Sequence, residues 1–231
     1  IPAAPQGLAP LSDATTSSLP RTARPYHYTI EVTPDAQALT FTGKSAVDMK
    51  VFEATPSLTL NANELTIASA RLAAAGGGAA MDLQVATDPQ AQTATFTAPA
   101  TIQPGTYRLE TEYTGTINTQ ANGLFALNYP DKRTGKDVRA LFTQFEAPDA
   151  RRFAPMFDEP AYKATFDLSA IVPADQMAVS NTPAASEDDL GDGTKRVTFM
   201  TTPKMSTYLL FFGLGDFERL AMPATAKVEA G

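Results

Sequence analysis

The sequence predicts an all-β domain, a sandwich of many short and mainly antiparallel strands. Apolar and polar residues alternate over short segments, as they do in half-buried strands. Turn residues recur at intervals of roughly ten residues, which is typical of β-sandwiches. A helical turn is suggested at most near residues 148–156, and Pro155 limits its length because proline lacks a backbone donor.

The strands follow from this alternation in chain order. In the first strand Tyr26, Tyr28, Ile30 and Val32 are expected to share one face, and the turn at Pro34 ends it. Further strands are expected at residues 41–52, 58–60, 65–72, 81–87, 93–97, 106–117, 124–129, 139–145, 164–172, 177–181, 196–200 and 208–214. Two stretches between strands predict turns, the hairpin loop 131–135 and the acidic, glycine-containing segment 186–193.

Composition excludes several classes of function. The chain has 231 residues, of which 43% are hydrophobic, so it can bury a core. Its formal net charge is −7 and no basic patch stands out, which argues against nucleic-acid binding. The absence of cysteine excludes disulfides and thiolate metal sites. No apolar run reaches the roughly 18 residues that span a bilayer, so no membrane span is predicted.

The chain divides into a short leader and one domain. Residues 1–24 are rich in Ala, Pro, Ser and Thr and predict a flexible leader of the kind that often follows an export signal. A periplasmic or otherwise exported protein is therefore expected, with the cytoplasm as the alternative. Residues 25–220 contain no linker and are predicted to form a single domain.

Residues 143–160 differ from an ordinary strand. They hold four acids, two arginines and three phenylalanines, and three prolines interrupt them. This composition predicts a rigid loop that carries charge over an apolar floor. Such loops often carry function, because the scaffold fixes their geometry. The alternative is a network of ion pairs that only pins a long connection.

Several short blocks of characteristic sequence cover about residues 25–220 in order: 25–28 (Pro-Tyr-His-Tyr), 60–67 (Leu-Asn-Ala-Asn-Glu-Leu-Thr-Ile), 122–125 (Asn-Gly-Leu-Phe), 143–147 (Thr-Gln-Phe-Glu-Ala), 149–152 (Asp-Ala-Arg-Arg), 158–160 (Asp-Glu-Pro), 163–166 (Lys-Ala-Thr-Phe), 179–181 (Val-Ser-Asn) and 202–209 (Thr-Pro-Lys-Met-Ser-Thr-Tyr-Leu). In these blocks the sequence resembles the aminopeptidase N family of zinc metallopeptidases. The resemblance implies a saddle-like N-terminal β domain that precedes a catalytic domain, with residues 221–231 as the start of the linker to it.

The zinc site of the family lies in that catalytic domain. An H-E-x-x-H site needs two histidines on one helix face, and this chain has one histidine in total, His27. We therefore expect no catalytic residue, metal ligand or bound cofactor in this chain, which should be inactive alone. Zinc is expected in the intact enzyme.

The resemblance implies two substrate-binding residues, Glu146 and Gln144. Glu146 matches the family's carboxylate that holds the free α-amine of a peptide, and Gln144 matches a position that lines the pocket for the first side chain. Strand alternation turns Phe145 to the opposite face, so it is expected in the core. Two alternatives stay open: Glu146 could pair with an arginine of 151–152, and Gln144 could satisfy backbone groups.

Other charged residues of this stretch are expected to be structural and to fix the loop that presents Glu146: Asp149, Arg151, Arg152, Asp158 and Glu159. Two functions from different classes follow. The first is the peptide-binding part of a zinc aminopeptidase, a partner of its own C-terminal catalytic domain, acting on peptides with a free N-terminus. The alternative is a non-catalytic β-sandwich interaction module related to the same family.

Overall fold

A computed structural model describes residues 1–146 and 148–220, and it confirms the all-β prediction. The largest sheet contains, in spatial order, β13 (Ala184–Asp189), β14 (Thr194–Phe199), β11 (Thr165–Pro173), β1 (Ala23–Asp35), β2 (Thr40–Val51), β8 (Gly105–Thr116), β4 (Leu65–Ala74) and β5 (Met81–Asp82). A second sheet contains β12 (Met177–Ser180), β15 (Phe212–Gly215), β10 (Asp137–Gln144) and β9 (Gly123–Pro130). A third contains β3 (Thr55–Asn61), β7 (Thr93–Ile102) and β6 (Gln84–Asp88).

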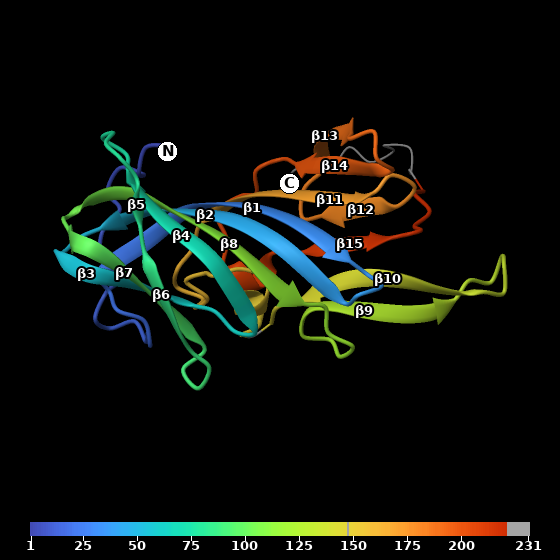
Figure 1. Cartoon of the computed structure of the whole chain (residues 1–231), viewed down its shortest axis with the longest axis horizontal. Helices are drawn as coiled ribbons and strands as arrows, with labels where there is room; N and C mark the ends of the chain where they lie inside the picture. Colours follow the sequence, from blue (N-terminus) through green and yellow to red (C-terminus); the bar gives the residue numbers. More distant parts are fainter. Residues whose placement is uncertain (147, 221–231) are drawn as a thin grey trace, which may run out of the picture.

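The two smaller sheets lie toward opposite ends of the long, twisted eight-stranded sheet (Figure 1). Pairing is antiparallel throughout the named strands except between β1 and β11, which run parallel. Two 3-10 turns, η1 (Ala150–Arg152) and η2 (Thr207–Leu209), supply the helical content of the described residues. The first lies inside the stretch 148–156, as the sequence predicts.

One hydrophobic core joins all three sheets. Its members include Tyr28 from the eight-stranded sheet, Phe96 from the three-stranded sheet and Phe212 from the four-stranded sheet, each fully buried. The ring of Tyr28 stacks on that of Phe166 at a centroid distance of 4.8 Å, which ties β1 to β11. Burial of this apolar surface is the main stabilising term of the fold.

Tyr26 departs from the predicted alternation. Tyr28, Ile30 and Val32 share the core face as expected, but a β-bulge between Pro25 and His27 turns Tyr26 out of the core cluster. Its hydroxyl instead donates a hydrogen bond of 2.7 Å to the Pro2 carbonyl. A bulge inserts one residue into a strand and so breaks the period of two.

Three predicted segments also need correction. The segment 81–87 divides into β5 and β6, which belong to different sheets. The acidic segment 186–193, predicted as a turn, begins as strand β13, because Ala184–Asp189 pairs with β14 and needs no apolar side chains at the edge of a sheet. The segment 208–214 begins in the 3-10 turn η2, and only Phe212–Gly215 forms a strand.

The residues before β1 contribute to the core. Leu11 and Leu19 are 8% and 4% exposed and belong to the core cluster. The flexibility of residues 1–24 and the domain boundaries 25–220 stay predictions, and the predicted linker 221–231 lies outside the described residues. Within the described ranges, no helix is both long and apolar enough to cross a membrane.

Candidate functional site

Gln144 and Glu146 lie at the end of β10, where the strand enters the charged loop. Thr143 and Phe145 are 7% and 2% exposed, whereas Gln144 and Glu146 are exposed. This alternation leaves the amide and the carboxylate open to solvent. The ring of Phe145 packs against that of Phe153 at 5.3 Å, which confirms Phe145 as a core residue.

A tight turn follows Glu146 and is closed by the Asp149 amide, which donates to the Phe145 carbonyl at 3.1 Å. The Asp149 carboxylate accepts a hydrogen bond of 2.7 Å from Arg152 Nε, and Arg152 also pairs with Glu64. Among the described residues, no side chain bonds to Glu146 or Gln144. Arg151 and Arg152 therefore pair with acids other than Glu146.

Arg152 also contacts the strand pair β9–β10, which carries Gln144. Gln144 pairs in register with Gly123 of β9, which has a φ of +63°. A Cβ atom at Gly123 would lie 2.9 Å from Cβ of Arg152, so only glycine allows this approach. One arginine therefore contacts both the turn after Glu146 and the strand beside Gln144.

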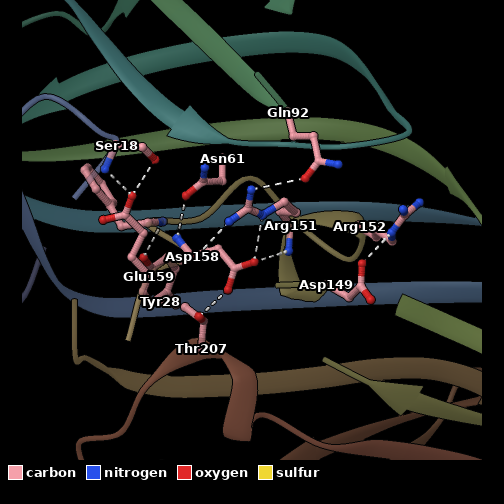
Figure 2. A network of polar contacts seen from close by, with 11 residues as sticks. Ser18, Tyr28, Asn61, Gln92, Asp149, Arg151, Arg152, Asp158, Glu159 and Thr207 are labelled. Carbon is pink, nitrogen blue, oxygen red and sulfur yellow. Dashed lines mark hydrogen bonds and ion pairs between the residues drawn. The ribbon is translucent and has the colours of Figure 1, made fainter. Parts of the chain in front are cut away.

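A buried ion pair holds the remainder of the loop (Figure 2). Asp158 Oδ2 accepts hydrogen bonds from the Arg151 amide at 3.1 Å and from Arg151 Nε at 3.0 Å. The other carboxylate oxygen accepts from Thr207 Oγ1 at 2.5 Å, and the Asp158 amide donates to Asn61 Oδ1 at 3.0 Å. The pair is nearly enclosed, with side-chain exposures of 10% for Arg151 and 3% for Asp158.

Two further contacts join this network to β1 and to the segment that precedes it. The Phe157 amide donates to the Tyr28 hydroxyl at 3.1 Å, and burial raises the pKa of that hydroxyl, which keeps it neutral. Glu159 Oε1 accepts hydrogen bonds from the Ser18 amide and hydroxyl at 2.7 and 2.6 Å. Burial acts to raise the pKa of Glu159, but hydrogen bonds from residues 17–19 together prevail and hold it below its ordinary value.

Sequence patterns alone miss two partners of the arginines, Glu64 and Gln92. Gln92 Oε1 accepts a hydrogen bond of 3.2 Å from Arg151 Nη1. Both residues have positive φ angles, +56° for Glu64 and +53° for Gln92, in the left-handed region that few non-glycine residues adopt. Glu64 directly precedes β4 and Gln92 directly precedes β7. The alternation of apolar and polar residues does not indicate which side chain either of them contacts.

The described residues do not fit a zinc site. They contain no group of three or more His, Cys, Asp or Glu side chains that could hold a metal ion. His27 lies on β1 with its ring nitrogens 2.8 Å from Thr165 Oγ1 and 3.2 Å from Asp167 Oδ2. These contacts link β1 to β11.

Comparison with known proteins identifies the family of the chain. Residues 24–209, which include the whole stretch 143–160, match the Peptidase M1 N-terminal domain. The chain belongs to this family. Its relatives include the puromycin-sensitive aminopeptidase of Caenorhabditis elegans, 36% identical over 212 residues, and the aminopeptidase N of Acetobacter pasteurianus, 38% identical over 200 residues. The alanine/arginine aminopeptidase of Saccharomyces cerevisiae is 34% identical over 206 residues.

This M1 N-terminal domain is much shorter than its relatives. The alignments cover 91% of the chain but 22% of the Caenorhabditis protein, and 87% of the chain but 55% of the Acetobacter protein. The chain thus spans between about a fifth and about half of the lengths of these aminopeptidases.

Proposed function

We propose that the chain anchors the free α-amine of a peptide substrate for a zinc aminopeptidase, with Glu146 as the anchor. The observation that carries this proposal is an exposed carboxylate, without a partner among the described residues, on a loop fixed by a buried ion pair. The α-amine has a reference pKa of about 8 and is largely cationic near neutral pH. A preorganised carboxylate binds such a cation without first breaking an ion pair of its own.

Glu146 would contribute to catalysis by positioning the substrate. A fixed amine places the first peptide carbonyl at a defined distance from the groups that react with it. A charge-assisted hydrogen bond of this kind contributes about 1.5–3 kcal/mol. Gln144 projects from the same side of β10 two residues earlier, and we assign it to the pocket for the first side chain of the substrate.

The hydrolytic chemistry would reside elsewhere in the longer protein. Zinc, when bound there, would supply the Lewis acid and activated water of the family's reaction. The described part of this chain has no metal-ligating group, so the chain alone should be inactive and its partner is its own C-terminal catalytic domain. Glu146 and Gln144 of this chain would bind and orient the substrate.

Kinetics of the longer protein test this proposal. Glu146→Ala should lower kcat/KM for amino-acid amides roughly 10- to 100-fold, as the loss of one charged hydrogen bond predicts. Glu110→Ala, an exposed carboxylate on β8, is the matched control and should have no effect. Wild-type kinetics of Glu146→Ala would refute the anchor. A longer protein without peptidase activity would favour the interaction module instead.

We also propose that the protein is exported, to the periplasm or otherwise out of the cytoplasm, because the first 24 residues resemble the segment that follows an export signal. Cell fractionation followed by immunoblotting would locate the protein. Recovery in the cytoplasmic fraction alone would contradict this proposal.

A further inference from the structure

The segment that precedes β1 is joined to the charged loop by polar contacts. Residues 11–19, which we call the strap, are anchored in the core by Leu11 and Leu19, which are 8% and 4% exposed. Beside Leu19, the amide and the hydroxyl of Ser18 donate hydrogen bonds of 2.7 and 2.6 Å to Glu159 Oε1. The strap therefore links the start of the chain to the charged loop.

The carboxylate of Glu159 depends on the strap for its hydrogen bonds. Within the described ranges, every hydrogen bond that this carboxylate accepts comes from the strap. Its second oxygen, Oε2, is buried and has no hydrogen-bond partner there. A buried charge costs free energy unless hydrogen-bond donors compensate for the water that it loses. The strap therefore determines the position of the Glu159 side chain.

The strap also holds the residue on the other side of Asp158. The Ser17 hydroxyl lies 3.2 Å from the Tyr162 hydroxyl, and the Tyr162 ring packs against the Phe157 ring at a centroid distance of 5.2 Å. The Tyr162 amide donates a hydrogen bond of 3.0 Å to the Glu159 carbonyl, which closes the turn between them. Both neighbours of Asp158 in the sequence are therefore held by the strap, one directly and the other through the Tyr162 ring.

Asp158 connects this arrangement to the turn that follows Glu146. Its Oδ2 accepts hydrogen bonds from the amide and from Nε of Arg151, at 3.1 and 3.0 Å. Arg151 belongs to η1, and the residue that precedes η1, Asp149, closes the turn after Glu146 with its amide. Figure 2 shows the contact between the strap and Glu159 directly beside the buried ion pair. The contacts are therefore continuous from the strap to the turn at Glu146.

We propose that Ser18 and Glu159 are positioning residues for the turn that presents Glu146, so that the strap supports capture of the α-amine of the substrate. The proposal rests on the proposed function, because it needs Glu146 as the amine anchor. Neither positioning residue touches the substrate. Their contact holds Asp158 and, through it, η1 in the arrangement that directs the Glu146 carboxylate toward the amine. Residues that share one hydrogen-bonded network show non-additive effects when they are substituted together, which makes this role measurable.

The test measures the amine preference of the longer protein, which is the ratio of kcat/KM for an amino-acid amide to kcat/KM for its des-amino analogue. Ser18→Ala should lower this preference about 2- to 10-fold, the range expected for residues coupled through one network. Glu159→Ala should lower it further, because it removes the acceptor of both strap hydrogen bonds. Glu159→Gln keeps an acceptor oxygen and should restore part of the preference. Ser12→Ala is the matched control in the same segment, since the Ser12 hydroxyl accepts only a local hydrogen bond from the Ala14 amide, and it should have no effect.

A double substitution separates positioning from general stabilisation. In the Glu146→Gln background, Ser18→Ala should leave the amine preference unchanged, because the strap acts through Glu146. A further fall in that background would overturn the proposal. So would an equal loss of activity on both substrates in Ser18→Ala, because the strap would then only stabilise the domain. If Glu146→Gln lowers the preference and Ser18→Ala does not, the positioning role fails and the amine anchor stands. If Glu146→Gln leaves the preference unchanged, both proposals fail.

Discussion

Removal of the Asp158 carboxylate should destabilise the domain strongly, because it leaves a buried cation without its partner. In Asp158→Ala, Arg151 would lose the acceptor of its amide and of its Nε, at 3.1 and 3.0 Å. Its side chain is only 10% exposed, so water cannot replace the lost carboxylate. Thr207 would lose its acceptor at the same time.

The magnitude follows from the burial of the pair. Breaking a buried ion pair by removal of one partner costs about 3–5 kcal/mol, a large part of the roughly 5–15 kcal/mol that stabilises a domain. With a urea slope of about 3 kcal/mol/M, the unfolding midpoint should fall by roughly 1 to 2 M.

Urea unfolding of the 231-residue chain, followed by circular dichroism, measures this change. Glu112→Ala is the control, because it breaks an ion pair with Lys44 whose side chains are 70% and 59% exposed. Such an exposed pair contributes at most about 1 kcal/mol. If Asp158→Ala and Glu112→Ala shift the midpoint equally, the buried network does not hold the loop as argued.

Three further predictions concern the same chain. Gly43→Ala should lower the free energy of unfolding in urea by about 1–3 kcal/mol, because the added Cβ would lie 2.4 Å from the buried ring of Tyr113. Gly76→Ala is the control and should be neutral, because nothing lies within 4 Å of its added Cβ. Equal effects of the two variants would contradict the close approach at Gly43. Leu19→Ala should lower the free energy of unfolding by about 2–5 kcal/mol, because Leu19 is 4% exposed in the core. An unchanged melting temperature would contradict the contribution of Leu19 to the core. Glu159 has a lowered pKa in the folded chain, so its contribution to stability is present above the ordinary value of 4.5 and is lost as the pH falls below it. The stability difference between wild type and Ser18→Ala should therefore shrink below pH 4.5, and a difference that grows there would reverse the sign of this argument.

The sequence predicts the fold where one face of a strand is buried. Ile30 and Val32 face the core because a half-buried strand requires alternation, and Phe145 obeys the same rule. Alternation does not predict the structure where backbone pairing or a bulge, and not side-chain burial, decides it. Backbone pairing alone makes β13 a strand, since all its side chains are exposed, and a bulge displaces Tyr26.

The candidate site was predictable only in part. Alternation places Gln144 and Glu146 opposite the buried Phe145, so their exposure follows from the pattern. Two partners of the arginines do not follow from it, because Glu64 and Gln92 reach them from segments far apart in the chain.

The most direct test of the account compares substrates with and without an α-amine in the longer protein. Wild type should prefer the amine-bearing amide over its des-amino analogue. Glu146→Gln should reduce that preference by roughly 10- to 100-fold, the ratio expected for about 1.5–3 kcal/mol of coupling between the carboxylate and the amine. An undiminished preference in Glu146→Gln would contradict the claim that this carboxylate holds the amine.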